Sequence, residues 1–153
     1  GAYGFLPNDR THQIKVYGNY QIMENLLLGF NSSISSGRPI NSFGVGHPDG
    51  APIYGDTFYL YSDITEDYTH TTRGSRGRTS WVARLDLNAV YSVDMFGGEL
   101  ELRAEMFNVL DAQAETEVFE YAELSEGVSD NRWGISQQFQ TPRSVRLGAS
   151  LRF

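Results

Sequence analysis

Residues 144–153 read SVRLGASLRF, and the side chains of this stretch alternate strictly between apolar and polar. The apolar positions are Val145, Leu147, Ala149, Leu151 and Phe153. Alternation with a period of two is the pattern of a β-strand that has one apolar face and one polar face. The stretch therefore predicts a strand whose two faces meet different surroundings.

The same stretch resembles the terminal sorting signal of bacterial outer-membrane β-barrels, in which the assembly machinery recognises the last strand. The resemblance rests on Arg146, Gly148, Leu151 and Phe153. It implies that these residues form an assembly signal. The alternation alone also fits an edge strand of a soluble sheet, so the rest of the chain must decide between the two environments.

Composition favours strands and turns. The 153 residues suggest one domain, with 20% charged and 13% aromatic residues and 16 glycines. No apolar run is long enough for a membrane-spanning helix, but the strands of a barrel are only half apolar. The mean hydropathy of -0.38 is therefore no argument for a soluble protein.

Two further features of the composition narrow the function. The chain has no cysteine, which excludes disulfides, thiolate metal sites and cysteine nucleophiles. The formal net charge of -7 disfavours a nucleic-acid binder, because such proteins need a basic field to displace counterions.

Alternation predicts five strands, each close to the length of about 9–11 residues that a tilted transmembrane strand requires. Their expected ranges are 11–22, 26–35, 81–93, 99–108 and 144–153.

Short and long connections alternate between these strands. Residues 23–25 and 94–98 form short turns, whereas the long connections cover about 37–80 and 110–142. An outer-membrane barrel has short periplasmic turns and long extracellular loops. With a periplasmic C-terminus, both short turns fall on the periplasmic side and both long loops are extracellular. Residues 57–62 are a weak candidate for an extra strand, but 37–80 shows no second convincing strand pair.

The two strand faces differ in the way a barrel wall requires. Tyr20, Tyr91 and Phe153 are expected on the outward face at one membrane level, and Trp81 at the opposite end. The inward face carries charges that would be costly to bury in a core, but a water-filled lumen accommodates them. These are Arg84, Asp86, Glu99, Glu101, Arg103 and Glu105. The solvated face of a one-sided soluble sheet remains the alternative.

An odd number of strands predicts additional sequence elsewhere. Single-chain bacterial barrels have an even number of strands, from about eight upward, and an open edge in lipid leaves backbone groups without partners. Residues 1–153 are therefore expected to be the C-terminal sector of a single, larger outer-membrane β-barrel domain.

Short motifs throughout the chain resemble the barrel of TonB-dependent outer-membrane receptors, most closely the Oar-like group. They are LPNDR at 6–10, SGRPI at 36–40, RGSRGR at 73–78, FNVLD at 107–111 and PRSVRLG at 142–148. The resemblance implies an all-β fold, an antiparallel transmembrane barrel of about 22 strands plugged by an N-terminal domain. It implies the import of a scarce ligand across the bacterial outer membrane, with energy delivered by TonB.

The same resemblance implies the molecules that the chain contacts. They are outer-membrane lipid and lipopolysaccharide, the upstream strands and plug, TonB through the N-terminal part, and the barrel-assembly machinery. No enzyme, cofactor or metal site is expected, because His12, His47 and His70 lack ligand spacing and no catalytic motif is present.

Ligand contacts are predicted in the first long loop. Arg73, Arg76 and Arg78 can grip anionic groups, including lipopolysaccharide phosphates, or can instead fix the mouth of the loop. Tyr59 and Tyr61 can stack on a sugar or an aromatic ligand, or can pack the loop on itself.

Two alternative functions stay open from the sequence. One is a secreted, soluble antiparallel β-domain that binds carbohydrate or a protein surface. The other is a passive porin or adhesin barrel, which would share the terminal signal.

Overall fold

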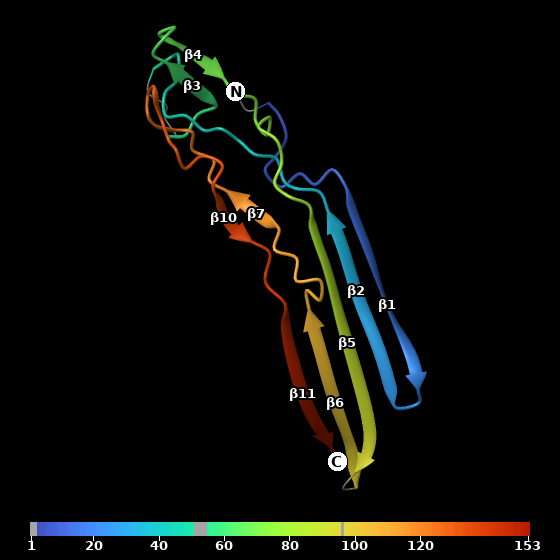
Figure 1. Ribbon diagram of the computed structural model, residues 1–153. Helices are drawn as coiled ribbons and strands as arrows, with labels where there is room; N and C mark the ends of the chain where they lie inside the picture. The colour runs from blue at the N-terminus through green and yellow to red at the C-terminus, as the bar shows by residue number, and fades with distance from the viewer. Residues whose placement is uncertain (1–2, 51–54, 96) are drawn as a thin grey trace. The chain divides into compact units, whose positions relative to one another are not determined.

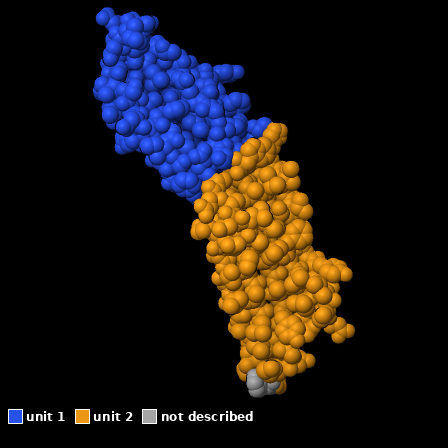
Figure 2. Space-filling model, viewed as in Figure 1, with its two compact units in different colours: residues 1–11, 36–80, 115–139 blue, residues 12–35, 81–114, 140–153 orange. Residues whose placement is uncertain are grey.

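The computed structural model describes residues 3–50, 55–95 and 97–153, and in these ranges the chain forms eleven β-strands. They fall into two compact units (Figures 1 and 2). Unit 1 contains Gly1–Thr11, Ser36–Ser80 and Glu115–Phe139, and unit 2 contains His12–Ser35, Trp81–Ala114 and Gln140–Phe153. The long connections of the sequence thus make up most of unit 1, and the long strands make up unit 2.

Unit 2 is one antiparallel sheet with the strand order β1-β2-β5-β6-β11 (Figure 1). The strands are β1 (Gln13–Met23), β2 (Leu26–Ser35), β5 (Val82–Met95), β6 (Gly98–Phe107) and β11 (Ser144–Arg152). This confirms the five strands predicted from alternation, with ends that differ by one or two residues. The largest extension is at β5, which continues through Asp94 and Met95 where a turn was expected.

The register aligns the apolar faces of all five strands. One row across the sheet joins Gly18, Phe30, Leu87, Met106 and Val145. The next row joins Tyr20, Leu28, Ala89, Ala104 and Leu147. Because directly opposed residues point to the same side of a sheet, every predicted outward position has outward neighbours. The predicted facing of the strands is therefore confirmed as one continuous apolar face.

Pairing on the two sides of β5 is offset along the strand. β2 pairs with residues 82–91 of β5, whereas β6 pairs with residues 87–95. Only residues 87–91 have ladder partners on both sides. The sheet is therefore sheared, and both of its ends step in the same direction from β1 towards β11.

The shear places the three outward aromatics in different rows of the sheet, and their common membrane level stays a prediction. Tyr20 pairs with Leu28, Tyr91 pairs with Leu26 in the next row, and Phe153 follows a β11 residue paired with Glu99. The three rings thus lie in successively later rows. Alternation fixes the face of each residue but not the stagger between strands, which depends on the pairing.

The FNVLD sequence covers the edge of β5 that the shear leaves without a ladder partner. Val109 N donates to Leu85 O at 2.7 Å. Asn108 leaves β6 with a φ of 48°, and its backbone N donates to Asp86 Oδ1 at 2.9 Å. Its side-chain Nδ2 donates to the carbonyl oxygens of Ala112 and Thr141 at 3.0 and 2.8 Å. Asparagine suits this position because it tolerates a left-handed backbone conformation and its side chain can form hydrogen bonds to nearby backbone groups.

Short turns close the opposite end of the sheet. The β5–β6 turn contains Gly97 with a φ of 79°, a conformation that glycine adopts at little cost. A Cβ on Gly98 would lie 2.1 Å from Arg152 O, so the close approach of β11 requires glycine there. These turns confirm that the short connections lie at one end of the sheet.

Unit 1 contains three small two-stranded antiparallel sheets. β3 (Tyr59–Ser62) pairs with β4 (Asp67–His70), β7 (Glu115–Val118) pairs with β10 (Ser136–Phe139), and β8 (Glu123–Ser125) pairs with β9 (Val128–Ser129). The β3–β4 hairpin corrects the expectation that 37–80 holds no second strand pair. Strands of two to four residues are too short for alternation to reveal.

Polar side chains, rather than apolar ones, fill the interior of unit 1. Among the described residues, Val118 and Pro39 are the buried apolar side chains larger than glycine. Asn41 is 1% exposed, and its Oδ1 accepts from Gly74 N at 2.8 Å while its backbone O accepts from Trp133 Nε1 at 3.0 Å. Asn41 Nδ2 donates to both carboxylate oxygens of Glu120 at 3.3 Å. These bonds tie together segments that are distant in the sequence.

Candidate functional site

The apolar face of the sheet in unit 2 is exposed from end to end. Ile14, Tyr20, Phe30, Val145 and Leu147 are 58%, 73%, 41%, 58% and 77% exposed. No described element of unit 2 covers this face, because the unit consists of a single sheet. A contiguous apolar patch of this kind marks contact with a membrane or another apolar surface.

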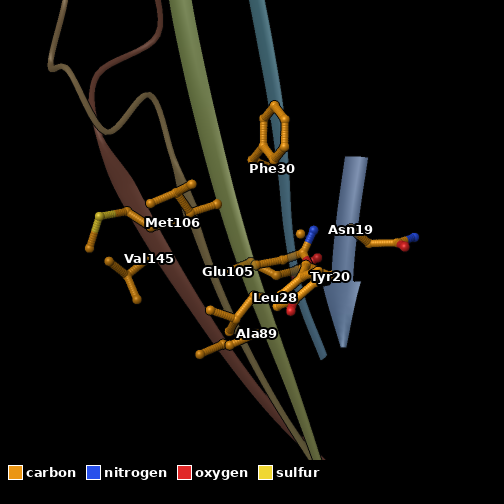
Figure 3. A pocket seen from close by; sticks show the side chains of 12 residues that line it. Asn19, Tyr20, Leu28, Phe30, Ala89, Glu105, Met106 and Val145 are labelled. Carbon is orange, nitrogen blue, oxygen red and sulfur yellow. The ribbon is translucent and has the colours of Figure 1, made fainter. Parts of the chain in front are cut away.

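A hollow of about 530 Å³ lies on this apolar face (Figure 3). Ala89 and Ala104 face each other across β5 and β6, and their small side chains leave the space. The larger Tyr20, Phe30 and Met106 side chains stand around it. The hollow is almost wholly apolar, so it suits hydrocarbon rather than a polar ligand.

The opposite face of the sheet carries paired charges. Arg84 Nε lies 2.8 Å from Asp86 Oδ1, and Arg103 Nη2 lies 2.8 Å from Glu101 Oε1. Arg146 from β11 pairs with Glu105 of β6, which is directly opposite in the register. The predicted charged face is thus confirmed, and most of its charges form ion pairs within the sheet.

The residues of the predicted assembly signal all lie on or next to β11, which is an edge strand. Arg146 and Gly148 are on the charged face, and Leu151 is on the apolar face opposite Leu100. Phe153 follows the strand and is 93% exposed. Their placement fits an accessible strand end, and their role in assembly stays a prediction.

The structure brings the two predicted loop tyrosines together with other rings. Tyr59 and Tyr61 share one face of the β3–β4 hairpin. The Tyr59 ring lies 4.8 Å from the His47 ring and 5.1 Å from the His70 ring, between centroids. Tyr61 packs edge-on against Tyr68 at 5.1 Å. These contacts favour packing of the loop on itself over an open stacking platform.

The three predicted loop arginines have separate surroundings. Arg78 forms an ion pair with Asp9 and lies over the Phe5 ring at 5.3 Å. Arg73 lies over the Phe58 ring at 5.8 Å and lines a cavity of about 260 Å³. Arg76 is exposed. Among the described contacts none joins two of these arginines, and those of Arg73 and Arg78 favour roles in holding the loop.

A cleft that the sequence did not predict lies within unit 1. It has a volume of about 460 Å³ and is lined by aromatic and polar side chains. The aromatic members are Phe43, Phe119 and Tyr121. Arg38 and Glu120 form an ion pair of 3.0 Å in its wall. No sequence signal could have found the cleft, because its residues come from three separate segments that only tertiary pairing brings together.

The aromatic rings of this cleft belong to a longer run of rings. Phe58 and Phe43 are 5.2 Å apart, Phe43 and Tyr121 are 5.7 Å apart, and Tyr121 and Phe119 are 5.4 Å apart, between centroids. Arg132 lies over the Phe119 ring at 4.6 Å. Tilted ring pairs at these distances are favourable beyond their buried area.

Carboxylates hold two phenol groups of unit 1 in their neutral form. The Tyr68 hydroxyl donates to Glu126 Oε1 at 2.6 Å, and this hydrogen bond raises the pKa of Tyr68 to about 12. The Tyr121 hydroxyl donates to Asp56 Oδ2 at 2.9 Å, and that hydrogen bond raises the pKa of Tyr121. A neutral phenol can still accept a hydrogen bond from a ligand at the rim of the cleft.

The described part of the chain holds neither a metal-binding cluster nor a membrane-spanning helix. No group of three or more His, Asp or Glu side chains there is arranged to hold a metal ion. No helix in the described ranges could cross a membrane.

One comparison with known proteins is informative. The chain is 37% identical over 89 residues to the TonB-dependent transporter Oar of Myxococcus xanthus. The matched segment covers 56% of this chain and 7% of that transporter, so the chain corresponds to a small part of its length. No protein-family model matches the chain, and neither does any solved structure. The chain is therefore β-rich with a distant, partial similarity to a TonB-dependent transporter.

Proposed function

We propose that the chain forms the C-terminal strands of a TonB-dependent outer-membrane transporter that takes up a scarce ligand. The observation that carries the proposal is the continuous apolar face of unit 2. Five strands place their apolar side chains on one side and their ion pairs on the other. A barrel wall between lipid and a wet lumen requires this division.

Burial gives independent support for the proposal. A soluble domain stabilises a sheet by covering its apolar face with another layer. In unit 2 the apolar side chains instead stay exposed, with Leu147 at 77%. Lipid would supply the missing apolar contact and would fill the hollow at Ala89 and Ala104.

The shear of the sheet supports a tilted wall. From the β1–β2 hairpin to the β6–β11 pair, the pairing shifts by about four residues, or roughly 14 Å at about 3.4 Å per residue. The centres of these pairs are about three strand spacings apart, or roughly 14 Å. The shift along the strands thus equals the distance across them, and this corresponds to a strand tilt of about 45°. Strands of outer-membrane barrels are tilted by about 35–45°. This tilt would bring Tyr20, Tyr91 and Phe153 close to one membrane level.

The proposal assigns a direction to the chain. The short connections between β1 and β2 and between β5 and β6 are periplasmic, and the connections that make up unit 1 are extracellular. The sheet contacts lipid and lipopolysaccharide, and its two edges pair with upstream strands around a plug. TonB acts through an N-terminal part, and the assembly machinery reads β11.

Cysteine labelling of the full protein in intact cells tests this topology. The chain has no native cysteine, so a single cysteine reports on its own position, provided that any native cysteines elsewhere in the protein are removed first. Ile64 is 96% exposed in the β3–β4 turn, and a cysteine there should react with an impermeant maleimide. A cysteine at Glu24 should react only after the outer membrane is permeabilised. Equal labelling of both positions in intact cells would contradict the proposal.

A genetic comparison tests the transport part. Deletion of the gene and deletion of TonB should produce the same uptake defect, and the double deletion should be no more severe. Additive defects would indicate a passive porin or adhesin instead. A soluble β-domain would be indicated if the full protein fractionated with soluble proteins.

A further inference from the structure

We propose that the cleft of unit 1 between Arg38, Phe43 and Tyr121 binds a neutral carbohydrate of about disaccharide size. The inference rests on the proposed function, because it names the ligand class that the extracellular unit would receive. The cleft volume of about 460 Å³ falls in the range of about 300–1,000 Å³ for small-ligand sites.

The aromatic wall supplies the apolar part of the recognition. Glu117, Phe119 and Tyr121 occupy alternating positions of the segment that continues from β7, and Phe43 packs beside Tyr121. Tyr121 is 40% exposed, so its ring is available to a ligand. The C–H face of a sugar ring is apolar, and stacking on such rings removes apolar surface from water.

The polar wall supplies donors and acceptors that the fold leaves unused. Among the described residues, the side chains of Asn8, Glu117 and Gln137 line the cleft without a hydrogen-bond partner. Amide and carboxylate groups can bond the hydroxyls of a sugar both as donors and as acceptors. Arg38 adds a further donor, because its described bonds use only Nε and Nη1.

Most of the charge in the cleft is compensated within its own wall. Glu120 is already compensated by Arg38 at 3.0 Å and by the Asn41 amide. Glu117 is then the one lining carboxylate without a basic partner among the described residues. The lining thus carries a single uncompensated negative charge, and a polyhydroxy ligand can donate hydrogen bonds to the Glu117 carboxylate and accept them from the Arg38 guanidinium.

Titration calorimetry on the full protein tests the assignment. The probes are maltose, cellobiose, xylobiose and N,N′-diacetylchitobiose, and the protein is held in a polyoxyethylene detergent, because glycoside detergents carry the chemical group under test. At least one disaccharide should bind saturably. Tetramethylammonium should neither bind at the cleft nor displace the disaccharide.

Variants connect the binding to the cleft. Tyr121→Ala should weaken the disaccharide at least about tenfold, whereas Tyr121→Phe, which keeps the ring, should change it little. Tyr3→Ala is the matched control, because Tyr3 is an 87% exposed tyrosine of the same unit outside this cleft. Glu117→Gln should retain binding of a neutral sugar, while Glu117→Ala should weaken it. Should Tyr121→Ala fail to fold, Phe119→Leu provides the same comparison.

Three results would overturn the inference. The first is that none of the four disaccharides binds. The second is that tetramethylammonium displaces the disaccharide and that Glu117→Gln no longer binds it. The third is that Tyr121→Ala and Tyr3→Ala bind the disaccharide with equal affinity. The titration does not depend on cellular location. It can therefore fail while the labelling topology holds, and the topology can fail while the cleft still binds sugar.

Discussion

At the scale of single residues, unit 1 depends on a few buried polar groups. Asn41 bonds to Gly74, Trp133 and Glu120, and all its polar atoms face partners from other segments. Composition could not reveal this role, because one asparagine among many polar loop residues carries no pattern. The SGRPI and FNVLD sequences stand out as motifs in the sequence. Only the structure shows that Asn108, in FNVLD, covers the part of the β5 edge that has no ladder partner.

Replacing Asn41 with Ala should destabilise unit 1 by about 2–4 kcal/mol, because Gly74 N and Glu120 would lose buried partners. Hydrogen exchange of peptides from 36–80 in the full protein should become much faster. Asn131→Ala is the control, because that asparagine is exposed. Unchanged exchange in Asn41→Ala would show that its bonds do not hold the unit.

Tyr68 should titrate at an unusually high pH. Its hydrogen bond to Glu126 raises its pKa to about 12, so this bond stabilises unit 1 below about pH 10 and is lost as the pH rises through about 12. Difference absorbance titration against Tyr68→Phe measures the midpoint. Glu126→Gln should lower it towards the ordinary tyrosine value, and an unmoved midpoint would refute the assigned cause.

At the scale of elements, the long strands were predictable and the short hairpins were not. β1, β2, β5, β6 and β11 show alternation over nine or more residues, which is long enough to identify each strand and its facing. β3 and β8 are too short for any period and are ordered by contacts with distant segments. Tyr61 N, for example, donates to Glu123 Oε1 at 2.7 Å.

Adjacent residues of β5 provide a test of facing. Leu87 is on the apolar face and Asn88 is on the polar face. Leu87→Arg should cost up to about 2–4 kcal/mol if the position lies near the bilayer midplane, and Asn88→Arg should cost much less. The amount of full protein assembled in the outer membrane, measured by heat-modifiable gel mobility, reports the difference. Equal losses would argue against a lipid-facing side.

The end of β11 provides a second test. Phe153→Asp should lower outer-membrane assembly more than Arg152→Asp, because Phe153 continues the apolar alternation of Leu147 and Leu151 whereas Arg152 is on the charged side. Quantitative immunoblotting of membrane fractions measures both variants. If both substitutions have the same effect, the last residue is not a specific part of the signal.

At the scale of the whole molecule, the two units suit different surroundings. Unit 1 contains most of the carboxylates behind the net charge of -7, and its interior is polar and hydrogen-bonded. Unit 2 is nearly balanced in charge and presents an apolar face. The sequence distinguishes the long loops from the strands, but nothing in its pattern indicates that the loops form a compact unit with a cleft of its own.

Residues 1–153 produced alone should need detergent to stay monodisperse. The exposed apolar face of unit 2 would associate in water. Sedimentation in plain buffer and in detergent gives the comparison. A monomer that unfolds cooperatively in plain buffer would indicate a soluble β-domain.

The strand order β1-β2-β5-β6-β11 has a consequence for the sequence of steps in which the sheet forms. The β1–β2 and β5–β6 hairpins each close through a short turn, so they can form quickly and locally. β2 can join β5 only after the 36–80 connection has brought them together, and β11 must wait for 115–143. Each of these two late strand pairings therefore depends on a segment of unit 1 that must fold first. A slow step in that unit would delay closure of the wall long after its hairpins exist.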